Sequence, residues 1–194
     1  MKFRAVVVPP AAARQEPRPP SIGVRDTTMA SKKKTWAEKL AKEDGLPKVI
    51  EVKPADRQRW GGATLVVPRP RDVDSLMKKV PVGKLITIAE LRQQVAAQHE
   101  AEAGCPITCG IFAWIAAHAA EEAAAAGKRK TTPWWRTLKT GGELNPKYPG
   151  GLAAQRKLLE GEGHKIVVKG KRAFVADFAE KIVGAKRSQA AVRE

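Results

Sequence analysis

The pattern of apolar and polar positions predicts an α+β chain that is mainly helical. Two runs rich in β-branched residues, 48–52 and 63–67, are separated by a polar stretch and predict a pair of strands. A shorter apolar run, 36–40, ends ahead of a Gly and a Pro and predicts a short helix. We expect these elements to form a small N-terminal region over residues 31–70.

Helical spacing of apolar residues begins after residue 70. Asp72 or Asp74 is placed to cap the first of these helices, which a Pro- and Gly-containing break then ends. The next helix has a stronger start signal, because Thr87 and Glu90 have the spacing of a capping box. We expect this helix to run to about Gln98. The apolar positions of the first helix follow the spacing i, i+3, i+4, i+7 and are Val73, Leu76, Met77 and Val80.

A long helix is predicted from Pro106, which suits the first helical position, to Ala126, which precedes Gly127. With the helix before it and the short Gly-containing turn between them, it has the outline of a helix-turn-helix. Two interpretations of its faces are open. In the first, small side chains approach a DNA groove, namely Ala113, Ala116, Ala117, Ala119 and Ala120. In the second, an apolar stripe packs into a core, namely Ile111, Trp114, Ile115 and His118.

The C-terminal pattern predicts a helix at 150–160, a basic hairpin at 165–175 and a short helix near 177–183. The cations at the hairpin turn are Lys169, Lys171 and Arg172. Either these residues belong to a solvated turn, or they form a wing that contacts phosphates of a nucleic acid. We expect residues 71–184 to form a winged-helix-like helix-turn-helix DNA-binding domain with small β elements.

The charge pattern indicates a polyanionic partner. The formal net charge is +16 and the isoelectric point is about 10.2. Segment 80–127 has 2 basic and 5 acidic residues, whereas 31–79 has 13 and 7, and 128–149 has 6 and 1. Because the basic residues flank the helix pair, we expect phosphate contacts from the flanking segments.

The cysteines and the apolar runs bear on whether the protein binds a metal or crosses a membrane. Cys105 and Cys109 are one helical turn apart, and no second Cys or His pair completes a tetrahedral site, so we expect neither a metal nor a cofactor. No apolar run approaches the ~18 residues of a membrane span. Free thiols fit a cytoplasmic, nucleoid-associated location, and we expect a monomer.

The two ends of the chain are expected to lie outside the folded part. Residues 1–30 are expected to be a disordered extension and residues 185–194 a charged tail.

The segment Thr131-Thr132-Pro133-Trp134-Trp135-Arg136 carries the most distinctive candidate chemistry. Pro133 fixes its own φ, so the two tryptophans are expected in a stiff extended turn instead of a helix. Indole faces can stack on a nucleobase, and Arg136 can reach a phosphate or a guanine edge. Trp also commonly completes a core. Because adjacent side chains in an extended turn point in opposite directions, we expect one Trp to be buried and the other to be presented.

Five features follow one another along residues 72–163. They are Val80-Pro81-Val82-Gly83-Lys84, Thr87-Ile88 at a helix start, the alanine-rich helix, Pro133-Trp134-Trp135-Arg136-Thr137, and Arg156-Lys157-Leu158-Leu159-Glu160-Gly161-Glu162-Gly163. This order resembles the DNA-binding domain of the O6-alkylguanine-DNA alkyltransferases (methylated-DNA-protein-cysteine methyltransferases) and of their alkyltransferase-like relatives. That family reads V/I-P-x-G-K, T/S-Y, a small-residue recognition helix, P-C-H-R-V and K-x-x-L-L-x-x-E-G.

The resemblance implies a DNA-binding protein that does not transfer alkyl groups. Trp134 stands in the place of the methyl-accepting cysteine, as it does in the alkyltransferase-like proteins, and Trp135 stands in the place of the general-base histidine. An indole supplies neither a thiolate nor a titratable base. Ile88 replaces the tyrosine that helps rotate the damaged nucleotide out of the helix. The chain has no clear counterpart of the family's arginine that fills the vacated stack, and in one alignment Trp114 falls near that arginine's position.

The site residues that the resemblance implies fall into two groups. A base pocket that accepts a flipped base is expected from Pro133, Trp134, Trp135 and Trp114. DNA contacts are expected from Lys84, Thr87, Lys128, Arg129, Lys130 and Arg136. The implied partners are double-stranded DNA, with O6-alkylguanine as its lesion, and downstream repair proteins.

Two other functions are compatible with the sequence. One is a basic nucleic-acid-binding or interaction module without lesion preference. The other is an enzyme in which Cys105 or Cys109 accepts the alkyl group, although neither cysteine has an evident base partner in the sequence. A basic module would bind alkylated and unmodified DNA equally, whereas a lesion binder would prefer the alkylated DNA. An enzyme that transfers the alkyl group would gain intact mass after incubation with alkylated DNA.

Overall fold

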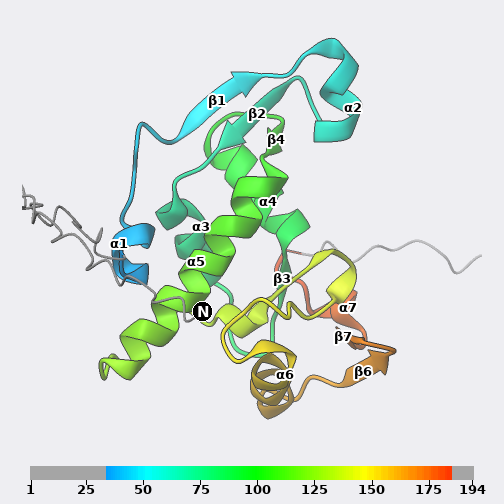
Figure 1. The fold of residues 1–194 in the computed structure, drawn as a ribbon. Coiled ribbons are helices and arrows are strands. Elements are labelled where there is room, and N and C mark those ends of the chain that lie inside the picture. Colours follow the sequence, from blue (N-terminus) through cyan, green and yellow to red (C-terminus); the bar gives the residue numbers. More distant parts are fainter. Residues whose placement is uncertain (1–33, 185–194) are drawn as a thin grey trace, which may run out of the picture. The chain divides into compact units, whose positions relative to one another are not determined.

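The computed structural model describes residues 34–184, so the expected extension at 1–30 and the expected tail at 185–194 lie outside the described residues. Helices and small sheets alternate along the chain (Figure 1), as the apolar pattern predicts. The helices are α1 (Trp36–Leu40), α2 (Arg57–Trp60), α3 (Pro70–Lys78), α4 (Ile88–Gln98), α5 (Pro106–Ala125), α6 (Gly151–Gly161) and α7 (Phe178–Lys181). The strands are β1 (Lys48–Glu51), β2 (Thr64–Val67), β3 (Ile86–Thr87), β4 (Ala103–Gly104), β5 (Thr137–Leu138), β6 (Ile166–Lys169) and β7 (Arg172–Val175).

The predicted N-terminal strand pair is confirmed, and a third strand extends it. β1 and β2 are antiparallel, with Lys48 opposite Val67. β4 then pairs with β2 in parallel, which the sequence did not indicate because Ala103 and Gly104 are poor strand residues. Gly104 is required by close approach, since a Cβ atom at this position would lie 2.6 Å from the carbonyl oxygen of Arg92 in α4. The turn between the two predicted helix-turn-helix helices is therefore anchored to the N-terminal sheet.

Helix α3 begins earlier than the capping signals indicated. Pro70 occupies its first turn, and the predicted cap Asp72 instead accepts a hydrogen bond from the backbone N–H of Arg69. Asp74, the alternative cap, is buried inside the helix, where its carboxylate contacts Lys78 Nζ at 2.6 Å and accepts a hydrogen bond from Thr132 Oγ1 at 2.5 Å. Because Pro tolerates the first turn of a helix, it sets the start here.

Helix α4 begins where the sequence predicts. Thr87 is its N-cap, and the capping box with Glu90 is present. Ile86 and Leu91, which flank this start at the spacing of a hydrophobic staple, are both buried. This start is specified by local hydrogen bonds, so short-range sequence signals are sufficient to find it.

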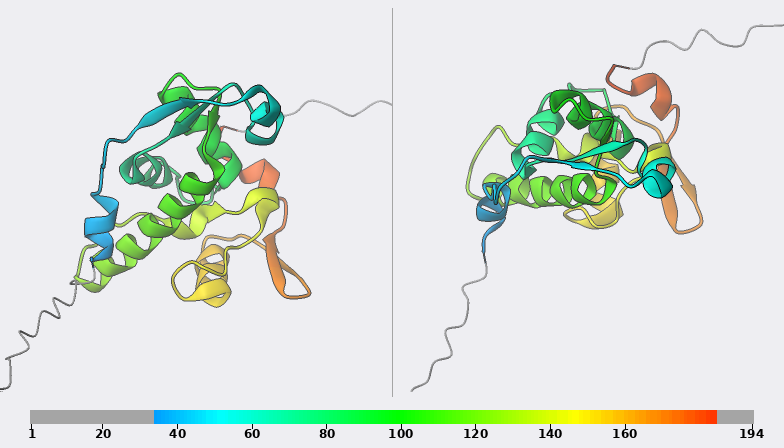
Figure 2. Two further views of the ribbon diagram at one scale, coloured as in Figure 1. Left: turned by 45° about the horizontal axis from the view of Figure 1, so that its top comes forward. Right: turned by 90° about the horizontal axis from the view of Figure 1, so that it is seen from above.

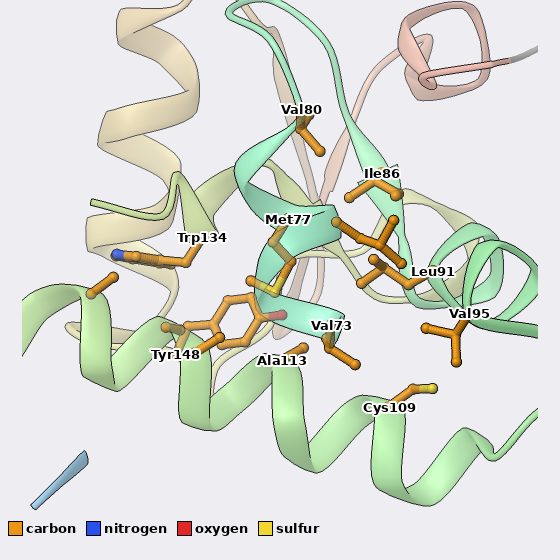
Figure 3. Packing of buried hydrophobic residues seen from close by; sticks show 14 of the residues in the cluster. Val73, Met77, Val80, Ile86, Leu91, Val95, Cys109, Ala113, Trp134 and Tyr148 are labelled. Atoms are coloured by element: carbon orange, nitrogen blue, oxygen red, sulfur yellow. The ribbon is translucent and has the colours of Figure 1, made fainter. Parts of the chain in front are cut away.

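Helix α5 buries its alanines, and this outcome contradicts both interpretations of its faces. Ala113, Ala116 and Ala117 are fully buried against the core, whereas Ile111 is 46% exposed and Ile107 is 58% exposed. The small side chains allow α5 to pack closely on α3, because interaxial distance depends on side-chain size at the contact. Figure 3 shows Ala113 and Cys109 of α5 facing Val73 of α3. Of the bulky stripe, Ile111 is therefore left exposed, whereas Trp114 is partly buried and packs against the first core cluster.

The buried residues form two main clusters. The first packs α3, α4 and α5 around Met77 and Leu91 and includes Trp134 and Tyr148 (Figure 3). The second lies between the β3–β5 pair, α6, α7 and the antiparallel β6–β7 hairpin. Figure 2 shows α1 beside the C-terminal half of α5, where Glu122 accepts a hydrogen bond from the backbone N–H of Ala37. The predicted basic hairpin is confirmed, and the winged-helix assignment stays a prediction.

Replacing a buried alanine of α5 with a larger residue should destabilise the fold. Ala117→Leu adds three carbon atoms to a fully buried contact, and overpacking of this kind costs about 1–3 kcal/mol. Ile111→Ala on the outer side of the same helix is the control and should change the free energy of unfolding by less than about 1 kcal/mol. Urea unfolding of both variants measures the difference. Equal destabilisation by the two substitutions would contradict the observed orientation of α5.

Candidate nucleic-acid interface

The double tryptophan forms a buried 3₁₀ turn instead of an extended platform. The turn spans Trp134–Arg136 and follows Pro133. The Trp134 side chain is 1% exposed, its Nε1–H donates to Glu121 Oε1 at 2.8 Å, and its ring meets those of Trp135 and Tyr148 edge to face. The prediction of an extended turn is wrong. Trp134 and the buried Pro133 belong to the first hydrophobic cluster and its border, so they do not present a surface to a base.

Arg136 is buried in a salt bridge, although the sequence suggested a DNA contact. Its guanidinium is bonded to the Glu162 carboxylate, with Nη2 at 2.7 Å from Oε1 and Nε at 3.0 Å from both oxygens. A fourth hydrogen bond, 2.6 Å long, runs from Nη1 to the carbonyl oxygen of Val80. The side chain therefore connects the Pro–Gly break before α4 with the end of α6. It is not free to contact a phosphate in this conformation.

Trp135 is half-buried and packs against both main clusters. Its Nε1–H also donates to Glu162 Oε1, at 2.7 Å, while the backbone N–H of Gly83 reaches Oε2 at 3.3 Å. Burial alone would raise the pKa of the Glu162 carboxyl, but the hydrogen bonds from Arg136, Trp135 and Gly83 lower this pKa below its ordinary value of 4.5. The Glu162 carboxylate is therefore ionised, and its hydrogen bonds join three segments that are distant in sequence.

An open, ligand-sized hollow lies between α5 and the segment that follows the β5 strand. Its volume is about 550 Å³, within the range of roughly 300–1,000 Å³ that is typical of small-ligand sites. The outer stripe of α5 forms one wall, and residues 145–147 form the other. The lining residues are Ile88, Ile107, Gly110, Ile111, Trp114, Lys139, Asn145, Pro146 and Lys147. We call this hollow the α5 groove.

Trp114 is the one predicted base-pocket residue that lines the α5 groove, and it is held in place from both sides. Its Nε1–H donates to the carbonyl oxygen of Lys147 at 2.9 Å, which joins the two walls of the groove. Its ring meets Trp36 of α1 edge to face at 4.7 Å, and Trp36 stacks on His118 at 4.4 Å. The rings of Trp36 and His118, together with the Lys147 carbonyl, therefore fix the orientation of Trp114.

Gln155 links the Trp turn to the groove. It is fully buried, its Nε2 donates to the carbonyl oxygens of Trp135 and Thr137 at 3.1 Å each, and its Oε1 accepts from the backbone N–H of Asn145 at 2.8 Å. Sequence reasoning missed Gln155 and most of the groove residues. The turn signal at Asn145–Pro146 and the i, i+3, i+4, i+7 spacing of Ile107, Gly110, Ile111 and Trp114 were the available signals.

The predicted DNA contacts do not form one surface. Lys84 is exposed beside the start of α4, whereas the Thr87 side chain is buried and bonded to Ala89 and Glu90 as the helix cap. Arg129 is exposed. Lys128 and Lys130 line a separate cleft of about 240 Å³ with α1, α3 and the end of α5. At 100° per residue, the cleft residues Ala119, Ala120 and Ala123 lie on the opposite face of α5 from the groove.

The two cysteines are buried free thiols. Burial raises the pKa of the Cys109 thiol to about 12, which disfavours the thiolate that alkyl transfer requires. In the part of the chain that the structure describes, no group of three or more His, Cys, Asp or Glu side chains is arranged to hold a metal ion. None of the helices between residues 34 and 184 is long and apolar enough to cross a membrane.

Comparison with known proteins adds a structural similarity. No protein-family profile matches the chain, and no curated protein sequence matches it. The structure is similar to that of Atl1 from S. pombe, solved in complex with damaged DNA containing O6-carboxymethylguanine. The two chains are 19% identical, the similarity covers 59% of this chain and 93% of that chain, and the TM-score is 0.41. Similarity of this extent establishes neither a family nor a function for this chain.

Glu162→Gln should destabilise the protein in a pH-dependent way. The substitution leaves Arg136 buried without a counter-charge, which costs about 3 kcal/mol at pH 7. Because the pKa of Glu162 is lowered on folding, the stabilisation is complete above pH 4.5 and is lost as the pH falls through the folded-state pKa. The difference between wild type and variant should therefore shrink in acid, as measured by urea unfolding between pH 7 and pH 3.

Glu160→Gln is the matched control for this experiment. Glu160 forms an exposed pair with Arg156 one helical turn away, so its loss should cost less than about 0.5 kcal/mol at any pH. A Glu162→Gln variant as stable as the Glu160→Gln variant at pH 7 would show that the Arg136–Glu162 pair does not hold the fold together.

Proposed function

We propose that this protein binds double-stranded DNA and accepts the base of an alkylated guanine in the α5 groove, without transferring the alkyl group. One observation carries the proposal. The groove brings together Ile88, which stands where the family has its nucleotide-rotating tyrosine, and Trp114, which in one alignment falls near the arginine that fills the vacated stack. These residues are 26 positions apart in sequence and line the same hollow.

The chemistry of the groove suits a base that carries an alkyl group. Ile88, Ile111 and Pro146 supply apolar surface, and the fixed indole of Trp114 supplies aromatic surface. Stacking of a base on an aromatic side chain contributes roughly 1–3 kcal/mol. An added alkyl group gains further stabilisation from apolar contact, at about 0.8 kcal/mol per buried methylene. A groove of this composition favours an alkylated base over an unmodified one.

Cations at the edge of the groove supply affinity for the DNA backbone. Lys147 is an exposed lining residue, and Lys139, also at the lining, is paired with Glu143 at 2.6 Å. Lys84 is exposed close to the chain segment that leads into Ile88. Phosphate contacts by such residues release counterions, so binding should weaken steeply with salt.

The residues at the acceptor position support a function without alkyl transfer. The Trp134 indole is buried and its only polar hydrogen is donated to Glu121, so it offers no nucleophile. The buried thiol of Cys109 stays protonated at neutral pH. The protein would therefore mark or shield a lesion for other repair proteins instead of reversing it.

A titration of two duplexes tests the proposal. The duplexes differ only in one O6-alkylguanine, and we expect wild type to bind the alkylated duplex more tightly and to gain no alkyl mass. Ile111→Ser should reduce the preference by about 1 kcal/mol, or about fivefold, because it removes apolar surface from the groove. Val49→Ser is the matched control, since Val49 is 47% exposed in β1 and outside the groove.

Equal affinity of wild type for the two duplexes would contradict lesion recognition and would favour the basic module without lesion preference. A mass gain of one alkyl group on Cys105 or Cys109 would contradict the non-enzymatic function. Equal effects of Ile111→Ser and Val49→Ser would place the recognition site outside the α5 groove.

A further inference from the structure

We propose that the β6–β7 hairpin is a second DNA-binding element, which contacts phosphates next to the α5 groove. The inference rests on the proposed function, and it assigns a role to a part of the chain that lies beyond the segment carrying the family resemblance. Residues 165–175 contain four cations and no acidic residue, namely Lys165, Lys169, Lys171 and Arg172. All four side chains are exposed.

The register of the hairpin sorts its residues onto two faces. Ala173 and Val175 are buried, and their cross-strand partners Val168 and Ile166 share that inner face. The outer face therefore carries Lys165, Val167, Lys169, Arg172 and Phe174. Within it, Lys169 and Arg172 lie over the Phe174 ring at 5.9 and 5.4 Å from its centre. An aromatic ring flanked by cations is a common composition of nucleic-acid-binding surfaces.

The cations are spaced along a length that matches a DNA strand. Lys165 and Lys169 are four strand residues apart, which corresponds to about 13 Å along the hairpin. Successive phosphates of one DNA strand are about 3.4 Å apart when measured along the helix axis, so a hairpin that lies along this axis spans several phosphates. Gly170, with a φ of 60°, opens the tight turn and places Lys171 at the tip.

The hairpin is joined directly to the segment that forms one wall of the groove. The backbone N–H of Leu144 donates to the carbonyl oxygen of Ala173 at 2.8 Å, and Glu143 forms a bridge with Phe174. Asn145, the next residue, already lines the groove. A duplex that places a base in the groove therefore has its backbone close to the hairpin. This continuity favours DNA over an acidic protein segment as the partner.

Nearby carboxylates leave most of the hairpin charge uncompensated. Glu143 is shared between Lys139 at 2.6 Å and Arg172 at 3.7 Å, and Glu160 is paired with Arg156. Among residues 34–184, no carboxylate lies within salt-bridge distance of Lys165, Lys169 or Lys171. These three lysines are therefore available to phosphates.

The test compares two triple variants by the salt dependence of duplex binding. The hairpin variant combines Lys165→Gln, Lys169→Gln and Lys171→Gln. The control variant combines Lys48→Gln, Lys53→Gln and Arg59→Gln, which removes the same charge from exposed residues around β1 and α2. Near-equal melting temperatures of all three proteins establish that each variant is folded.

We expect the hairpin variant to lower the slope of log K against log salt by about 2–3, since each phosphate contact contributes about 0.9. The control variant should change the slope by less than about 1. Because the hairpin contacts the backbone, the ratio of affinities for alkylated and unmodified duplex should stay unchanged in the hairpin variant.

A hairpin variant that binds duplex with the same salt dependence as the control variant would overturn the assignment and leave the proposed function intact. A hairpin that serves an acidic protein would give that same result. Wild-type protein that shows no salt-dependent binding to either duplex would overturn the proposed function together with this inference.

Discussion

The structure depends on one ionised carboxylate, that of Glu162. It accepts hydrogen bonds from Arg136, Trp135 and Gly83, and Arg136 in turn bonds the carbonyl oxygen of Val80. The Pro–Gly break before α4, the Trp turn and the end of α6 are thereby fixed to one another. Because a buried guanidinium without its partner is costly, these three segments are expected to fold together or not at all.

Elements with local causes could be predicted from the sequence. The start of α4, the short α1 helix and the β6–β7 hairpin depend on caps, turns and alternation within a few residues, and they form where the sequence indicates. The orientation of α5 could not be predicted, because both of its faces are apolar and only packing on α3 decides between them. The burial of Arg136 likewise depends on Glu162, a partner 26 residues away, which no local pattern reveals.

The kind of candidate site indicated by the sequence stays a prediction, and its expected position at Trp134 is corrected by the structure. Charge indicated a polyanion, and aromatic residues indicated stacking, but the structure moves the open aromatic surface from Trp134 to Trp114. The reason is physical, since a Trp that follows a buried proline and borders Tyr148 completes a core more readily than it faces water. Trp134 still matters to the site indirectly, because its turn is joined through Gln155 to the segment that forms the groove wall.

Close packing through alanine leaves α5 with two independent surfaces. The inner surface tolerates little variation, since each alanine contacts the neighbouring helix directly. The outer positions Ile107 and Ile111 bear no such constraint, because they contribute little to the buried core. Substitutions at these two positions are therefore expected to change the chemical character of the groove while the fold keeps its stability. For the proposed lesion binder, this makes the outer side of α5 the place at which to redirect recognition toward other modified bases.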